Sequence, residues 1–248
     1  MNTSTSDEID SKESSARVRK IFGWRFWLFL AVTLVVLSAL ISPLVIRCQK
    51  KPDQTEATSN LRQIGLALFE FESEYGSYPN EATVAIVTKK HPNHGYDLSG
   101  TSSNALFRQL FAAGVTTSEQ MFYAKVEGTK KPDGNFHKEA VLEPGEVGFG
   151  YIAGLSSAGN PAQVIAFCPI IPGTDRFDPK PFKGSAVFLR KDNSVSSLKI
   201  DKNGHVIVRG KNILSSEHDV GNGIPLDIRY PELPVPHRYS FFRKFFSN

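Results

Sequence analysis

Few polar side chains in this sequence are spaced closely enough to suggest shared chemistry. His91 and His94 have the spacing H-x-x-H, which a pair of zinc ligands can adopt, but they flank Pro92 in a polar stretch. A zinc site needs three or four converging ligands, and no cysteine motif or partner carboxylate completes this pair. We therefore interpret both histidines as loop residues.

Two other pairs of residues have types that could bind a metal or form a catalytic dyad. Asp175 and Asp178 lie in the loop PIIPGTDRFDPKPFKG together with an arginine and a lysine. Calcium prefers six to eight oxygen ligands, and these two carboxylates supply only a few of them. The sequence leaves calcium binding at this loop open. His218 and Asp219 are interpreted as surface residues. We assign no metal ligand.

The common catalytic templates are missing from the sequence. It contains no G-x-S-x-G, P-loop, H-E-x-x-H or C-x-x-C pattern. The glycines of VGFGYIAG lie in strand-like sequence, where they indicate bulges or close packing rather than phosphate binding. We therefore predict that the protein is not an enzyme, and we assign no catalytic or cofactor-binding residue and no cofactor.

Charge and cysteine content exclude two further classes of protein. The formal net charge of +4 is spread along the chain without a groove-reading motif, so no nucleic-acid partner is expected. The two cysteines, Cys48 and Cys168, are too few for a disulfide scaffold. We do not expect them to pair, because Cys48 abuts an apolar segment while Cys168 ends a strand pattern.

That apolar segment is the strongest signal in the sequence. Residues 26–46 read FWLFLAVTLVVLSALISPLVI, 21 positions without a charge, flanked by basic residues and by Trp24. About 20 apolar residues suffice to cross a bilayer as a helix. We predict a transmembrane helix over 24–46, in contact with the lipid bilayer, after a disordered basic tail over 1–23. A folded domain then occupies 53–248.

Helical patterns open the predicted domain. Asp53 and Glu56 can cap a new helix, which Gly76 and Pro79 would end. Weaker helical spacing continues over 81–89 and 102–113. The apolar residues of the first helix step by three and four, so they form one stripe facing a core: Leu61, Ile64, Leu68, Phe71 and Tyr75.

Strand patterns follow in the second half of the domain. Residues 147–153 and 163–168 are the first candidates, and SAVFLRK-DN-SVSSLKI-DKNG-HVIV predicts an antiparallel meander with a two-residue Asp192-Asn193 connection. One face of this sheet should pack on the helix from Asp53 to Tyr75. Helices followed by an antiparallel sheet predict the α+β class.

The stretch NLRQIGLALFEFESEYGSYP, residues 60–79, resembles the segment after the membrane helix in prepilin-like proteins related to the major pseudopilin of type II secretion. A proline late in the apolar helix, Pro43, fits the same architecture, as do the basic leader and the sheet. The chain is similar in kind to a large bacterial prepilin-like family of unknown function. Many members of that family end in a hairpin with a His-x9-Asp-Gly signature. Asp192 and Asn193 align with its Asp-Gly, but Phe182 stands at the histidine position, so that part of the signature is missing.

The resemblance weakens at the processing site. Relatives carry a Gly-Phe pair and a nearby glutamate, positions that here fall on Ile21-Phe22 and Phe26. That acid is thought to guide subunits into filaments, so this chain keeps the anchor but lacks an assembly element of the family. Whether the leader is processed and whether filaments form stay open.

The resemblance implies a location and a role. It implies a single-pass protein of the bacterial inner membrane, with a cytoplasmic N-terminus and a periplasmic or extracytoplasmic pilin-like domain. Its role would be structural or interactive, in type II secretion or a pilus-like assembly, with self-association or other envelope proteins as partners. The alternative is a non-polymerising anchor whose domain binds a ligand or envelope component.

The C-terminal sequence RYSFFRKFF, residues 238–246, combines four phenylalanines with three cations. It could dock on a membrane surface, contact a partner, or cover the core of its own domain, and the sequence leaves these alternatives open.

Overall fold

A computed structural model describes residues 24, 26–38, 52–137, 140–215 and 225–233. The chain divides into two units, Met1–Lys50 and Lys51–Asn248, which are described separately. In the first unit, residues 26–38 are helical and their side chains are exposed. Among the described residues, no helix is both long and apolar enough to span a membrane. The predicted tail over 1–23, and residues 39–46 of the predicted transmembrane segment, lie outside the described part.

The second unit begins with the long helix α2, Pro52–Tyr75, which confirms the first predicted helix. Proline suits the first helical position because its missing N–H would have no intrahelical partner. Gly76 ends the helix with a φ of 81°, and its N–H donates to the carbonyl of Glu72 over 2.8 Å. The five residues of the predicted stripe are each no more than 7% exposed: Leu61, Ile64, Leu68, Phe71 and Tyr75.

Two shorter helices and a 3-10 turn contact α2. Helix α3 is Glu81–Lys90, α4 is Ser103–Ala112, and the turn η1 is Gln120–Phe122. Asn80 caps α3 by accepting the N–H groups of Ala82 and Thr83. Helix α4 is buried at nine of its ten positions, so it belongs to the core rather than to the surface.

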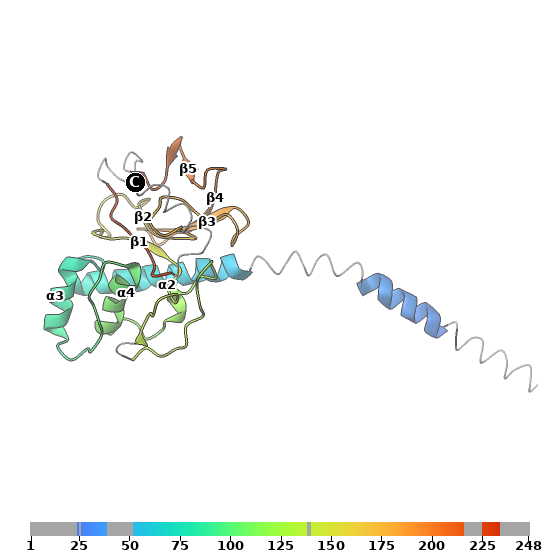
Figure 1. Cartoon of the computed structure of the whole chain (residues 1–248), viewed down its shortest axis with the longest axis horizontal. Helices are drawn as coiled ribbons and strands as arrows, with labels where there is room; N and C mark the ends of the chain where they lie inside the picture. The colour runs from blue at the N-terminus through green and yellow to red at the C-terminus, as the bar shows by residue number, and fades with distance from the viewer. Residues whose placement is uncertain (1–23, 25, 39–51, 138–139, 216–224, 234–248) are drawn as a thin grey trace, which may run out of the picture. The chain divides into compact units, whose positions relative to one another are not determined.

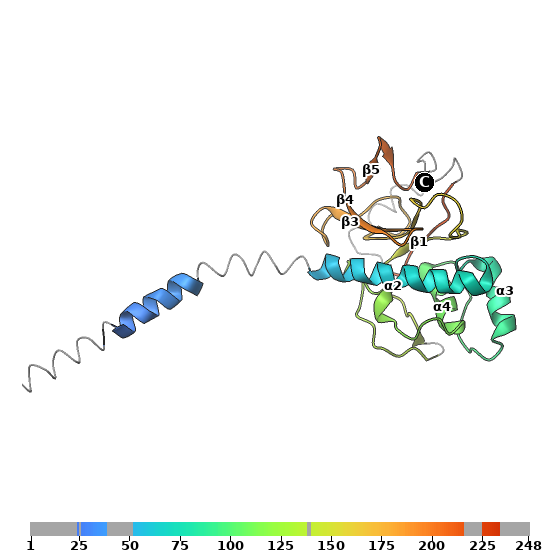
Figure 2. The same cartoon turned by 180° about the vertical axis from the view of Figure 1, so that it is seen from behind.

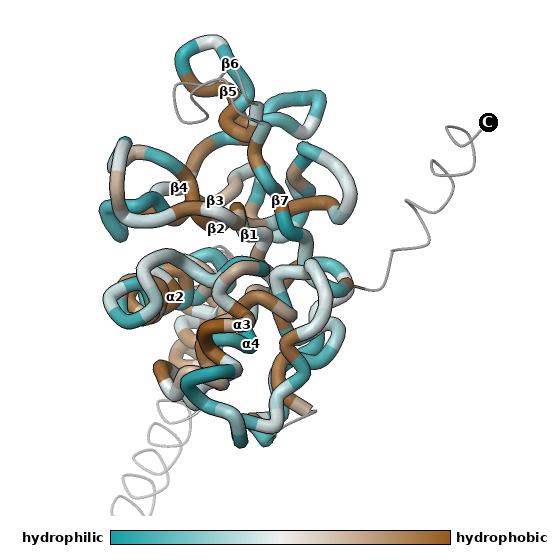
Figure 3. Tube along the Cα trace, turned by 90° about the vertical axis from the view of Figure 1, so that its left-hand side faces the viewer, coloured by the Kyte–Doolittle hydropathy of each residue, from teal (hydrophilic) through white to brown (hydrophobic). Residues whose placement is uncertain are grey.

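An antiparallel sheet of strand order β4-β3-β2-β1-β7 covers the helices. Helices α2, α3 and α4 lie on one side of this sheet, and a two-stranded ribbon of β5 and β6 lies on the other (Figures 1, 2 and 3). The arrangement confirms the predicted α+β class. The strands are β1 Gly150–Ile152, β2 Val164–Cys168, β3 Ser185–Arg190, β4 Val195–Lys199, β5 Ile207–Val208, β6 Lys211–Asn212 and β7 Ile228–Arg229.

The alternation of side chains along β3 divides the interior into two clusters. Val187 and Leu189 belong to the cluster that includes the α2 stripe. Phe188 points the other way and packs on Phe177, with ring centroids 5.3 Å apart and planes at 73°. The predicted packing of one sheet face on α2 is therefore confirmed, and the opposite face has an aromatic core of its own.

Gly150, at the start of β1, and Gly148, just before it, serve close packing, as predicted. A Cβ on Gly150 would lie 2.6 Å from Cε2 of Phe167, and one on Gly148 would lie 2.8 Å from the Cβ of Ala124. Larger residues at these positions would separate β1 from its neighbours.

The predicted two-residue connection between β3 and β4 is wrong. The N–H of Asn193 donates to the carbonyl of Arg190, and the N–H of Arg190 donates to that of Ser194, so Lys191, Asp192 and Asn193 together form the connection. Asn193 has a φ of 61°, as expected for the residue that replaces glycine. A turn followed by one left-handed residue is a common hairpin geometry.

The last predicted meander strand, residues 205–208, is also wrong, because it does not pair with β4. The turn forms, since the N–H of Asp201 donates to the carbonyl of His205. Val206 is then buried in the aromatic cluster, which draws the chain out of the sheet. Strand β5 pairs instead with β6 through Arg209 and Gly210, both at positive φ.

Gly65 gives a direct test of the contact between α2 and the sheet. An added Cβ would lie 2.0 Å from Oδ1 of Asn193 and 3.1 Å from Cδ1 of Leu189. Alanine favours a helix by about 1 kcal/mol over glycine, but overpacking costs about 1–3 kcal/mol. We expect Gly65→Ala to lower the free energy of unfolding, measured by urea denaturation, by up to about 2 kcal/mol net.

Two variants control this experiment. Leu66→Ala, on the neighbouring side chain that is 61% exposed, should change the free energy of unfolding by less than about 0.5 kcal/mol. Asn193→Gly removes the obstructing amide and still tolerates the positive φ, so Gly65→Ala should cost much less in that background. An equal cost in both backgrounds would contradict the contact.

Candidate functional site

The two histidines of the H-x-x-H pattern make separate structural contacts. Nε2 of His91 lies 2.9 Å from the Tyr75 hydroxyl, and Nδ1 of His94 accepts the N–H of Tyr96 over 2.9 Å. They lie beside an open hollow of about 440 Å³, whose wall also includes Phe111. Both histidines thus hold the loop after α3 in place.

Asp175 and Asp178 make separate hydrogen bonds. Oδ1 of Asp178, which is buried, accepts the N–H of Lys180 over 3.0 Å, while Oδ2 of Asp175 accepts the amide of Asn212 over 3.0 Å. In the described part of the chain, no three His, Cys, Asp or Glu side chains are grouped as a metal site would require. Cys168 is a free, fully buried thiol whose pKa is raised by burial.

Three predictions fall on residues that are not described. Cys48, the pair His218 and Asp219, and the aromatic segment 238–246 lie outside the described residues.

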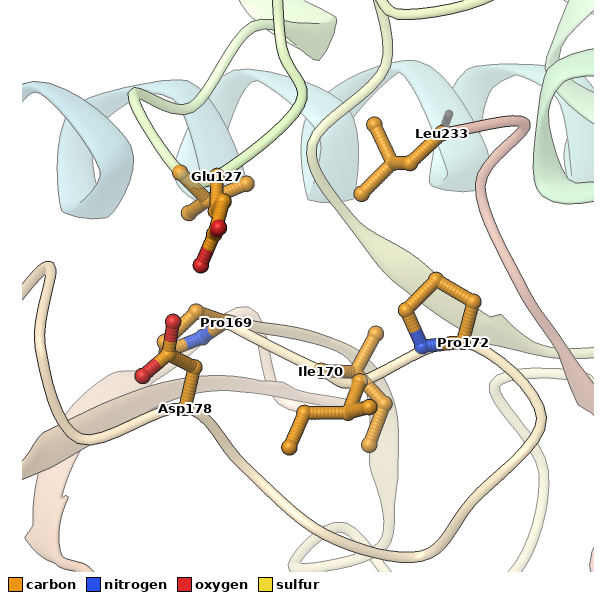
Figure 4. Close-up of a pocket in the computed structure, with 8 residues that line it drawn as sticks. Glu127, Pro169, Ile170, Pro172, Asp178 and Leu233 are labelled. Carbon is orange, nitrogen blue, oxygen red and sulfur yellow. The ribbon is translucent and has the colours of Figure 1, made fainter. Parts of the chain in front are cut away.

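A narrow slot opens between the sheet and the loops that surround it. Its volume is about 20 Å³, enough for one water molecule. Glu127 and Asp178 lie at one end, Leu233 and Pro172 at the other, and Ile170 forms the floor (Figure 4). The volume of this slot is far below the roughly 300–1,000 Å³ of a typical small-molecule site.

The most unusual chemistry lies in two buried carboxylates that sequence reasoning did not single out. Glu119 precedes η1 and is 2% exposed, and Glu146 follows a turn and is 1% exposed. Each accepts a backbone N–H from the same segment. Oε1 of Glu119 accepts from Leu142 over 2.9 Å, and Oε2 of Glu146 accepts from Glu143 over 2.8 Å.

Burial controls the electrostatics of this pair. Desolvation is the largest cause that raises the pKa of Glu119, opposed by hydrogen bonding from the Leu142 N–H. Desolvation likewise raises the pKa of Glu146, and the charge of Glu119 raises it further. Lys130 acts in the opposite direction, with its ammonium 3.6 Å from Oε1 of Glu146 and paired to Glu143.

One oxygen of this site is poorly satisfied. Oε2 of Glu119 is buried and makes no hydrogen bond of normal geometry within the described residues, although the nearby Gly134 N–H lowers the pKa of this carboxyl. An ionised oxygen in that position is costly, since burying an uncompensated charge is strongly unfavourable. Because the pair is closed to solvent, it can bind a proton but cannot reach a substrate in this conformation.

The sequence offers only a weak signal for the site. Glu119 resembles an ordinary residue before a helical turn, and Glu146 follows the Glu143-Pro144-Gly145 turn. An acid directly before the apolar run VGFGYIAG was the one available indication. Their proximity depends on loop folding, which neither helical nor strand periodicity describes.

The chain matches no protein-family model, no curated protein and no solved structure.

Glu119→Gln tests the electrostatics of the pair. A raised carboxyl pKa in the folded state means that its stabilising effect is complete below the unfolded value, here 4.5, and is lost as pH rises through the folded pKa. We expect the variant to have a free energy of unfolding about 1 kcal/mol higher at pH 7.5, because a neutral amide costs less to bury. It should also show a weaker fall in stability between pH 5 and pH 7.5.

Urea denaturation over that pH range measures both effects. Glu70→Gln removes an exposed carboxylate from α2 and serves as the matched control, which should leave the pH profile unchanged. A Glu119→Gln profile parallel to that of the wild type would exclude Glu119 as a source of pH dependence.

Proposed function

We propose that this protein is a membrane-anchored, pilin-like protein with a structural or interaction role in the bacterial cell envelope. The observation that carries the proposal is the sequence of elements: an apolar run over 26–46, then α2, whose single buried stripe packs on an antiparallel sheet. The resemblance of residues 60–79 to prepilin-like proteins supports the same role.

In this role, the anchor helix would pack against neighbouring helices in the membrane, and the surface of the domain would contact other proteins. The N-terminus would lie in the cytoplasm and residues 53–248 outside the inner membrane, as the resemblance implies. Partners would be the lipid bilayer through 24–46 and other envelope proteins or copies of the chain.

A second candidate function is ligand binding without polymerisation. Ile21-Phe22 and Phe26 stand where prepilin-like relatives have their processing pair and glutamate, which disfavours filament assembly. The hollow beside His91, His94 and Tyr96 has the volume of a ligand site and lies at the end of α3. In this version the domain would bind an envelope component there.

Charges placed in the apolar run test the anchor. An arginine at the centre of a membrane helix costs about 2.5–3.5 kcal/mol, so the double variant Val35→Arg, Val36→Arg should move the protein from the carbonate-washed membrane fraction to the soluble fraction. Ile86→Arg, at an exposed apolar side chain of α3, is the matched control and should stay in the membrane fraction. Wild-type protein that is released by carbonate would contradict the proposal.

Intact mass and cross-linking separate the two candidate functions. A shortened chain with cross-linked ladders is expected of a filament subunit whose leader has been removed. An uncut, monomeric chain in the membrane would instead support the binding protein.

A further inference from the structure

The described C-terminal residues, 225–233, form a strap that joins the sheet to the helices. Strand β7 pairs with β1 through Ile152 with Ile228 and Tyr151 with Arg229, so the strap completes one edge of the sheet. Beyond β7, the hydroxyl of Tyr230 donates to the carbonyl of Thr174 over 2.9 Å. Three segments distant in sequence thus meet at this strap.

Past the sheet, the strap is held by hydrogen bonds rather than by a strand ladder. The N–H of Ser103 donates to the carbonyl of Tyr230 over 3.0 Å, and the N–H of Gly145 donates to that of Glu232 over 2.7 Å. The N–H of Glu232 donates to Oδ1 of Asn104 over 2.9 Å. Its carboxylate accepts the hydroxyl of Ser102.

Asn104 connects the strap to the segment that the two buried carboxylates bind. This fully buried side chain donates from Nδ2 to the carbonyls of Leu142 and Glu143, at 3.0 and 3.2 Å. The N–H groups of the same two residues donate to Glu119 and Glu146. Residues 142–145 therefore have the carboxylates on one side and the strap on the other.

The backbone of this segment is strained. Leu142 is fully buried with a φ of 49°, a conformation that non-glycine residues rarely adopt. Such strain persists only where surrounding contacts impose it. Here those contacts include Glu119 at the N–H of Leu142 and the guanidinium of Arg108 at its carbonyl, 3.1 Å away.

We propose that Glu119 and Glu146 form a proton-dependent clasp for the C-terminal strap. When one carboxylate holds a proton, the pair lacks mutual repulsion and residues 142–145 keep both the strained backbone and the bonds to Asn104 and Glu232. When both are ionised, the segment loosens and the strap opens from α4. The clasp is independent of the proposed membrane anchor.

Neighbouring charged groups affect the equilibrium between the protonated and the fully ionised states of the Glu119–Glu146 pair. Asp133 and Glu143 add negative charge from the loop, and Lys130 opposes it. Arg108 contributes a cation from α4, and Glu232 a carboxylate from the strap. Burial of both carboxylates adds to the repulsion between them and favours proton uptake, so the strap should be tighter in mildly acidic solution than at neutral pH.

Hydrogen exchange followed by mass spectrometry tests the clasp in the full chain. After correction for intrinsic exchange rates, peptides covering 140–146 and 225–233 should exchange several-fold faster at pH 7.5 than at pH 5.5. Peptides of β2 and β3 should stay protected at both values, because they lie in the centre of the sheet. Equal exchange of the strap at the two pH values would overturn the proposal.

Variants identify the groups responsible. Glu119→Gln with Glu146→Gln should remove the pH dependence of strap exchange, whereas Glu70→Gln should keep it. Lys130→Met, at a side chain half exposed, should preserve folding and increase strap exchange at pH 7.5, because the opposing cation is lost. Unchanged strap exchange in Lys130→Met, or pH dependence that persists in a folded double variant, would count against the clasp.

Discussion

The contact between the buried stripe of α2 and the inner face of β3 is the constraint on which the rest of the domain depends. Leu61, Ile64 and Leu68 are fully buried on the helix, and Val187 and Leu189 are fully buried on the strand. Gly65 allows the two backbones to approach at the β3–β4 connection, where a larger residue would meet Asn193. Once the distance between α2 and β3 is fixed, β2 and β1 extend the sheet from β3. The face of the sheet directed away from α2 must then be covered by other segments of the chain.

That opposite face explains why the second half of the chain departs from a simple meander. Phe167 and Phe188 project away from α2, and Phe177, from the loop between β2 and β3, packs against both; the three rings need further apolar partners. Val206 supplies one of them, and the ribbon of β5 and β6 follows it over this face. Burying an apolar surface of this size outweighs the few backbone hydrogen bonds that a further strand beside β4 would have gained.

Elements formed by interactions between residues close in sequence can be predicted from the sequence, whereas those formed by distant residues cannot. Helix α2 and strands β1 to β4 can be predicted because their periodicity is local. The positive φ of Asn193 can be predicted too, but the length of its turn cannot, because it depends on the pairing of Arg190 with Ser194. Strand β7 has only two residues, and it exists because β1 offers an open edge. Glu119 and Glu146 could not be paired from sequence, since their proximity depends on irregular loops that cross near Leu142.

The two halves of the domain are therefore stabilised by different kinds of contact. Around β3, the strands are held by backbone hydrogen bonds and by apolar packing. Neither depends on a titratable group, so a change of pH leaves them intact. Around Leu142, side chains of Glu119, Asn104 and Arg108 take the place of a ladder. A hydrogen bond to an ionised group is stronger than a neutral one, but burying that ion is costly. Any response of this domain to its surroundings should thus begin in the irregular half and reach the sheet through the strap.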